Sequence, residues 1–127
     1  MQLLLQNNLP FITITLGYQQ KTITIDNVLV DTGSASTILA TEIVAGVQLV
    51  PMPNDKLHII RGVGGRETVF SRVVDFIQIG NYKLPRFEIE IGGMDYGFNI
   101  NGILGMDFLV QSGAIINLQS MRLTFDN

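Results

Sequence analysis

The segment Asp31-Thr32-Gly33-Ser34 places a carboxylate in a tight loop directly after the hydrophobic run Val28-Leu29-Val30. A positioned carboxylate can donate or accept a proton during a reaction. Two carboxylates roughly 3 Å apart cannot both ionise, so they share one proton, and such a pair can activate a water molecule. The motif occurs once in the chain, so we predict that a second copy of the chain supplies the other carboxylate.

Asp-Thr-Gly is also an ordinary turn sequence, because aspartate and glycine both favour turns. The surroundings of this turn favour a catalytic role. Val28-Leu29-Val30 precedes it and Ile38-Leu39 follows it, so the loop is expected to lie in a core. Burying a charged turn costs free energy, which a turn without a function would not repay. We therefore predict that Asp31 is catalytic.

The composition excludes several other functional classes. The chain has no cysteine, which excludes disulfides and thiolate chemistry, and its single histidine excludes a histidine-rich metal site. We therefore expect no metal and no cofactor. The net charge is −3 and the basic residues are scattered, a pattern unlike a nucleic-acid-binding surface.

Length and hydropathy limit the organisation of the chain. With 127 residues, 46% of them hydrophobic, we expect one domain over residues 1–127 with a substantial core. No apolar run approaches the length of a membrane span, and the first residues lack the pattern of a signal peptide. No membrane partner is expected, and a cytoplasmic location is favoured.

Alternation of apolar and polar residues dominates the local pattern and predicts β-strands. Ile12, Ile14 and Leu16 alternate with threonines, for example. The predicted hairpins join residues 12–16 to 22–25 around a turn at 17–20, residues 76–79 to 86–91 around a turn at 80–82, and residues 114–118 to 122–125 at the end of the chain.

Helical signals are few. A short helix is predicted over residues 42–45, with Thr41 as its N-cap and an end near Gly46. A second is predicted over residues 106–112, because Gly113 can adopt the left-handed conformation that ends helices. Asp107 lies in the first turn of the second helix, where an acidic group complements the helix dipole.

A glycine-rich segment, Gly62-Val63-Gly64-Gly65, lies between the apolar stretches 57–60 and 67–70. Glycines at a hairpin tip give the mobile loop that a lid over a binding site needs. A phosphate-binding loop is the rival interpretation, but the following Lys-Ser/Thr and helix are missing. A plain surface hairpin remains the alternative.

Asp31-Thr32-Gly33-Ser34, the glycine-rich segment and Ile103-Leu104-Gly105, in this order, resemble the retropepsin-like aspartic proteases. This family includes the retroviral proteases and their single-domain cellular and bacterial relatives. The resemblance covers most of the chain. It implies an all-β, closed β-barrel-like domain with one short C-terminal helix, and a homodimer whose active site lies on the twofold axis.

The resemblance also assigns roles to residues. Asp31 would pair with Asp31 of the second chain, Thr32 would interlock the two loops, and Gly33 would offer hydrogen bonds to the substrate. Ser34 can donate a hydrogen bond to the outer carboxylate oxygen. Residues 62–65, with Val63 as a substrate contact, would form a flap that pairs with an extended peptide. The pocket wall would consist of Ile103, Leu104 and Gly105.

One feature of the viral enzymes is missing. They carry an acidic residue and an arginine that form an ion pair at the dimer contact, and Ala35 and Met106 occupy these positions here. We therefore expect a different dimer contact. The predicted function is an aspartic endopeptidase that cleaves extended peptides beside an apolar side chain. The alternative is a catalytically silent, dimeric peptide-binding or assembly module of the same fold.

Overall fold

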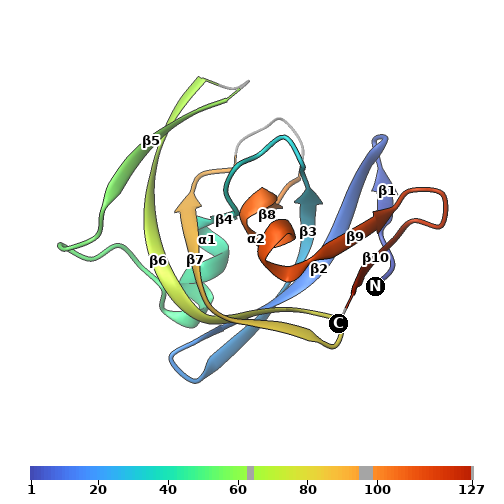
Figure 1. The fold of residues 1–127 in the computed structure, drawn as a ribbon. Coiled ribbons are helices and arrows are strands. Elements are labelled where there is room, and N and C mark those ends of the chain that lie inside the picture. The colour runs from blue at the N-terminus through green and yellow to red at the C-terminus, as the bar shows by residue number, and fades with distance from the viewer. Residues whose placement is uncertain (63–64, 95–98, 127) are drawn as a thin grey trace.

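The computed structural model describes residues 1–62, 65–94 and 99–126, and within them the chain is built mainly of β-strands (Figure 1). The strands are β1 (Leu4–Gln6), β2 (Leu9–Tyr18), β3 (Lys21–Val30), β4 (Ile38–Ala40), β5 (Leu57–Gly62), β6 (Gly65–Ile79), β7 (Tyr82–Gly92), β8 (Gly102–Leu104), β9 (Ala114–Asn117) and β10 (Arg122–Phe125). The helices are α1 (Thr41–Val44), a 3₁₀ turn (Ala45–Val47) and α2 (Met106–Ser112). The predicted all-β class is confirmed.

The main sheet closes into a ring. Its strand order is β1-β2-β3-β8-β4-β7-β6-β5, and an additional pairing between β2 and β6 joins the two ends of the ring. The strands β1 and β5 are attached outside the closed part, as Figure 1 shows for β5 on the left. The predicted barrel-like closure is therefore confirmed.

Local alternation produces the hairpins that were predicted. In β2 the side chains of Ile12, Ile14 and Leu16 are buried, while Thr13 and Thr15 between them are partly exposed. The turn to β3 is tighter than expected, because it consists of Gln19 and Gln20, whose φ angles are 50° and 68°. Two successive residues at positive φ give a turn whose twist matches that of the paired strands.

The last hairpin, β9 and β10, forms a separate two-stranded sheet. The outer edge of β10 is occupied by the first residues of the same chain. Leu3 N donates to Met121 O at 2.8 Å, and Leu123 N donates to Met1 O at 2.9 Å. The beginning and the end of the described chain therefore lie side by side (Figure 1).

The two helices agree with the predictions in position but not in every detail. α2 ends at Gly113, which has a left-handed φ of 67° as expected. The prediction that Thr41 caps α1 is wrong, because the N-cap is Ala40 and no side chain caps it. The strand β4 runs through Ala40 directly into the helix, so Thr41 is already its first residue. Of the described residues, none forms a helix long and apolar enough to cross a membrane.

The core fixes α2 against the barrel. Phe108 of α2 is fully buried and meets the ring of Phe87 on β7 edge to face, with 5.8 Å between the ring centres. Leu104, at the end of β8, is also fully buried. The end of β8 and the start of α2 adjoin the predicted catalytic loop. Both are therefore anchored in the packed hydrophobic core.

A second anchor joins the connection before β5 to the barrel. The Arg72 guanidinium on β6 donates to both carboxylate oxygens of Asp55 at 2.7 Å, to Tyr18 Oη at 2.8 Å and to Val50 O at 3.2 Å. Asp55 also accepts a hydrogen bond from Met52 N. The hydrogen bond from Arg72 is the main reason that the pKa of Asp55 lies below its ordinary value of 3.8.

This anchor predicts an acid-sensitive contribution to stability. Because the pKa of Asp55 is lower in the folded chain, its carboxylate stabilises the fold above pH 3.8, and this stabilisation is lost as the pH falls through the folded-state pKa. We predict that Asp55→Asn lowers the melting temperature at neutral pH, and that its difference from the wild type shrinks at acid pH. Thermal melts followed by circular dichroism measure both. Asp126→Asn, at an exposed carboxylate, is the control; an equal effect there would contradict the anchor.

Candidate active site

Asp31 lies at the end of β3 and continues the pairing of that strand. β3 and β8 are parallel, with Val30 opposite Leu104, and Asp31 N donates to Leu104 O at 3.0 Å. β8 also pairs with β4, which follows the loop, so Ile103 lies between Leu29 on one side and Ile38 on the other. The loop of residues 31–37 therefore passes around the end of β8.

The loop forms a compact turn around the carboxylate. Gly33 N donates to Asp31 Oδ1 at 2.8 Å, and Ser34 N donates to Asp31 O at 3.2 Å. A Cβ on Gly33 would lie 3.1 Å from the same carboxylate oxygen, which is a tight contact. The hydroxyl of Ser34 donates to Ser36 O at 2.8 Å. In the single chain, Ser34 therefore does not make the expected hydrogen bond to the carboxylate.

The loop is more exposed than the sequence predicted. Its flanks are buried, with Val30 at 6% and Ile38 at 5% of full exposure. The carboxylate residue itself is half-buried, however, and Thr32 and Gly33 are exposed. The expectation of a loop in the core is thus wrong for the single chain, because the apolar flanks belong to the strands and the tip projects beyond the end of β8.

The start of α2 holds the far side of the loop. Met106 N donates to Ser34 O at 2.8 Å, and Asp107 N donates to Ala35 O at 3.3 Å. A Cβ added to Gly105 would overlap the carbonyl group of Ser36 and come within 3.0 Å of Ser34 O. Glycine is therefore needed at position 105 because the backbone of the loop passes directly against it.

Asp107 has a larger role than its place in the helix predicted. Its Oδ2 accepts a hydrogen bond from Thr37 N at 3.1 Å, and its Oδ1 accepts one from Thr37 Oγ1 at 2.7 Å. Thr37 Oγ1 in turn accepts a hydrogen bond from Gly105 N at 3.1 Å, and Thr37 is fully buried. We call Thr37 and Asp107 the loop brace. Sequence reasoning missed it, and no local pattern pairs residues this far apart.

The two apolar residues of the predicted pocket wall face opposite sides of β8. Leu104 is fully buried in the main core. Ile103 is 7% exposed and belongs to a smaller cluster with Phe11 and Ile100, against which Leu29 packs. Leu29 lies two residues before Asp31, and side chains two positions apart along a strand point to the same face. Asp31 and this smaller cluster therefore lie on the same side of β3.

A family model described as aspartyl protease matches residues 13–108. The chain belongs to this family. The family is of the retropepsin-like type, as the sequence predicted. The match begins in β2 and ends in α2, so it includes the loop of residues 31–37, Gly105 and the loop brace. A search of curated proteins gave no match to the chain.

The glycine-rich segment of this chain is bounded by Gly62 and Gly65, the last paired residues of β5 and β6. The two strands pair in register from Leu57 opposite Phe70 to Gly62 opposite Gly65. Hairpin strands on both sides of the segment are thus confirmed. Val63 and Gly64, the predicted centre of the flap, lie outside the described residues.

The structure places the single histidine of the chain at the surface. His58 is exposed on β5, and Glu88 is exposed on β7. Within residues 1–62, 65–94 and 99–126, no group of three or more acidic, histidine or cysteine side chains could hold a metal ion.

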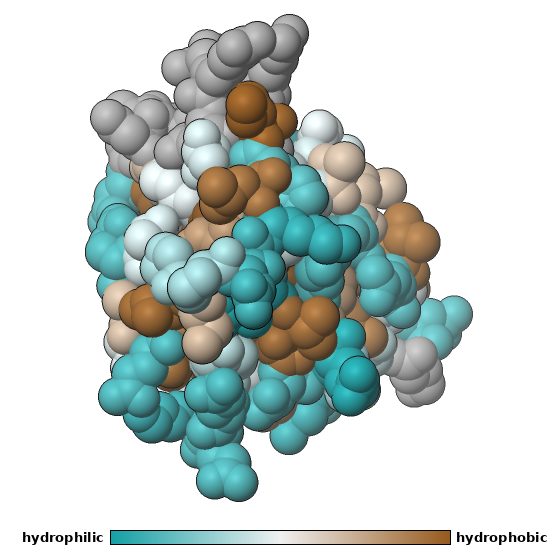
Figure 2. All heavy atoms as spheres, turned by 90° about the vertical axis from the view of Figure 1, so that its left-hand side faces the viewer, coloured by the Kyte–Doolittle hydropathy of each residue, from teal (hydrophilic) through white to brown (hydrophobic). Residues whose placement is uncertain are grey.

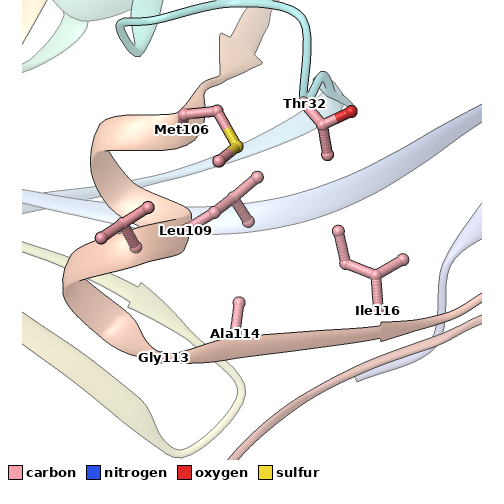
Figure 3. Close-up of a pocket in the computed structure, with 7 residues that line it drawn as sticks. Thr32, Met106, Leu109, Gly113, Ala114 and Ile116 are labelled. Atoms are coloured by element: carbon pink, nitrogen blue, oxygen red, sulfur yellow. The ribbon is translucent and has the colours of Figure 1, made fainter.

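An open groove of about 410 Å³ lies beside the carboxylate loop (Figure 3). Thr32 lines it from the loop, and Met106, Leu109 and Val110 line it from α2. Its floor continues along Gly113, Ala114 and Ile116 at the end of α2 and in β9. Figure 3 shows the side chains of Met106 and Leu109 directed toward the side of the groove where Thr32 lies.

The loop brace should contribute more to the free energy of unfolding than the interaction of Asp107 with the helix dipole alone would. We predict that Asp107→Ala lowers the free energy of unfolding by about 1–3 kcal/mol, because it leaves the buried donors of Thr37 without their acceptor. Urea unfolding measures the change. Glu42→Ala removes an exposed acid from the first turn of α1 and serves as the matched control. Equal losses for both variants would show that Asp107 acts only on the helix dipole.

Proposed function

We propose that this chain is an aspartic endopeptidase that hydrolyses peptide bonds in extended substrates as a homodimer, with Asp31 contributed by each chain. The observation that carries the proposal is the exposed Asp31 loop in a chain of the aspartyl protease family. The loop is held firmly from behind by β8 and α2, but its tip is open. A second, identical loop can therefore approach it.

The proposed chemistry needs two carboxylates with unequal protonation. Two aspartates roughly 3 Å apart share one proton, since two negative charges cannot be held so close together. The ionised carboxylate takes a proton from a water molecule, whose oxygen attacks the peptide carbonyl carbon. The protonated carboxylate gives its proton to the carbonyl oxygen. The tetrahedral intermediate then collapses, the C–N bond breaks, and a proton passes to the amine nitrogen.

The neighbours of Asp31 support this chemistry in the proposal. Gly33 keeps the backbone close to the carboxylate, where its amide orients Asp31 Oδ1. Thr32, at the exposed tip, meets the loop of the second chain. Ser34 and Gly105 fix the far side of the turn. The hairpin tip with Gly62, Val63, Gly64 and Gly65 acts as the flap that pairs with the substrate backbone.

The substrate class follows from the surface beside the carboxylate. The cluster that contains Ile103 and Phe11 is apolar, and Leu29, Leu9 and Met94 pack against it while remaining partly exposed. An apolar side chain of the substrate gains free energy by covering such a surface. The proposal therefore includes a preference for an apolar residue next to the cleaved bond. Leu104 supports the wall from inside the core and does not touch the substrate.

Loss of the carboxylate tests the proposed activity. We predict that Asp31→Asn lowers the rate of peptide cleavage at least about 100-fold, because an amide can neither accept the proton of water nor share a proton with its partner. Cleavage of a peptide library between about pH 4 and 7, analysed by mass spectrometry, measures the rate and the side-chain preference.

Asp75→Asn is the matched control, because Asp75 is an exposed aspartate on β6, away from the loop. This variant is expected to retain wild-type activity. Full activity of Asp31→Asn would contradict the proposal. Protein that binds peptides but never cleaves them, in the wild type as well, would instead indicate a peptide-binding module.

A further inference from the structure

We propose that the free edge of β5, together with the apolar side chains of Leu57 and Ile59, is an accessory binding site for the protein substrate. The site takes an extended segment with apolar and acidic residues that lies outside the cleaved stretch. The inference rests on the proposed function, because it adds a substrate contact to that activity. Its residues belong neither to the proposed flap, residues 62–65, nor to the Asp31 loop.

Leu57 and Ile59 are apolar but face water. Leu57 has the largest exposed fraction, 69%, among the large apolar side chains that the structure describes, and Ile59 is 65% exposed. Neither side chain belongs to a core cluster. Edge strands are usually protected by charges, proline or a bulge, because an apolar edge attracts other chains. An occupant that covers these two side chains gains the free energy of removing them from water.

The two side chains lie on one face of the β5–β6 hairpin. Leu57 is opposite Phe70 and Ile59 is opposite Thr68, and directly opposite residues of an antiparallel pair point to the same side. Phe70 is 5% exposed and belongs to the main core, whereas Thr68 is exposed. An apolar strip therefore continues on this face from the core out to the free edge of the sheet.

The connection before β5 adds apolar groups at the base of the strip. Arg72 lies two residues after Phe70, so it points to the same face, and it donates to Val50 O at 3.2 Å. Val50 and Met52 in this connection are 46% and 56% exposed. Figure 2 looks onto the side with β5, where hydrophobic groups reach the surface between hydrophilic ones. Apolar side chains therefore border β5 at its start as well as along its length.

The backbone of β5 offers hydrogen bonds to the same occupant. One edge of β5 pairs with β6, and within the described part of the chain no strand pairs with the other edge. Figure 1 shows β5 on the outside of the barrel. An extended segment can add to such an edge as a further strand and place alternate side chains on the apolar face. A helix could not make these backbone hydrogen bonds, so we infer an extended occupant.

The charge of the hairpin selects the chemistry of the occupant. Residues 56–68 carry Lys56, Arg61 and Arg66 against Glu67, and they include the one histidine of the chain. The rest of the chain has five basic and ten acidic residues. A basic strand in an acidic chain attracts acidic partners. A second copy of the chain fits poorly, because pairing β5 with β5 would bring two basic strands together.

The position of β5 favours the substrate as the occupant. β5 ends at Gly62, where the proposed flap begins. A segment bound along β5 can therefore belong to the same polypeptide as the cleaved stretch, joined to it by a short connection. A second contact of this kind raises the local concentration of the cleaved stretch and leaves the chemical step unchanged. It lowers KM and does not change kcat.

The first experiment measures binding without cleavage. Asp31→Asn protein is titrated by fluorescence polarisation against three short labelled peptides, which alternate valine with glutamate, valine with lysine, and serine with glutamate. We expect the valine–glutamate peptide to bind at least about 10-fold more tightly than the other two, because only it supplies both apolar and acidic groups. N-methylation of one of the two alternate sets of its amides is expected to abolish binding, since that set pairs with β5.

Variants of the hairpin locate the bound peptide. Ile59→Gln is expected to weaken binding of the valine–glutamate peptide at least about 10-fold. Val73→Gln is the matched control, because Val73 is 49% exposed on the opposite face of β6. Lys56→Glu is expected to weaken the valine–glutamate peptide and to strengthen the valine–lysine peptide. Circular dichroism verifies the fold of each variant.

The second experiment measures the effect on cleavage. A peptide that the wild type cleaves is extended by a flexible linker and the valine–glutamate segment, and the reference carries a glycine–serine tail of equal length. We expect the valine–glutamate tail to lower KM at least about 10-fold and to leave kcat unchanged. Ile59→Gln is expected to remove this advantage while it cleaves the reference peptide like the wild type.

The results separate this inference from the proposed function. Equal binding of the three peptides, or equal weakening by Ile59→Gln and Val73→Gln, would overturn the site even if peptide cleavage is observed. Binding at β5 without any effect of the tail on KM would overturn its role in substrate recognition. Selective binding at β5 by a protein that cleaves no peptide would support the docking edge and contradict the protease proposal.

Discussion

The hydrogen bonds between residues 31–37 and residues 104–107 are the constraint on which the rest of the structure depends. Asp31 N is bound to Leu104 O, and the backbone of the loop lies so close to Gly105 that no side chain fits there. The barrel, the buried Phe108 and the loop brace all serve to keep these two segments in contact. The carboxylate is therefore fixed in direction within the single chain, which in the proposed protease lowers the cost of ordering the site.

The parts of the fold that depend on local patterns could be predicted from the sequence. Alternation around Ile14 and Leu16 specifies a strand with one buried face, and Gly113 specifies the end of α2, since both signals involve neighbouring residues. The family was also predictable, because the order of Asp31-Thr32-Gly33 and Ile103-Leu104-Gly105 is distinctive. These motifs identify two segments that come into contact in the fold, but they do not reveal the hydrogen bonds that join them.

What could not be predicted depends on contacts between distant parts of the chain. The hydrogen bond between Thr37 and Asp107 joins residues 70 positions apart in the sequence. The hydrogen bond between Arg72 and Asp55 joins β6 to the irregular connection before β5. The exposure of Thr32 was missed for the same reason, because apolar flanks show that strands are buried but not how far the loop between them projects. In the proposed dimer this exposed tip is covered by its own copy.

The central claim is that one site is built by two chains, and subunit mixing tests it most directly. Wild-type protein is combined with an equal amount of Asp31→Asn, shown beforehand to dimerise, and the exchanged mixture is assayed at the total protein concentration of the wild-type sample. If each site needs both carboxylates, only dimers of two wild-type chains are active, and the activity falls to about one quarter. An activity of about one half would mean that each chain works alone, and would contradict the account.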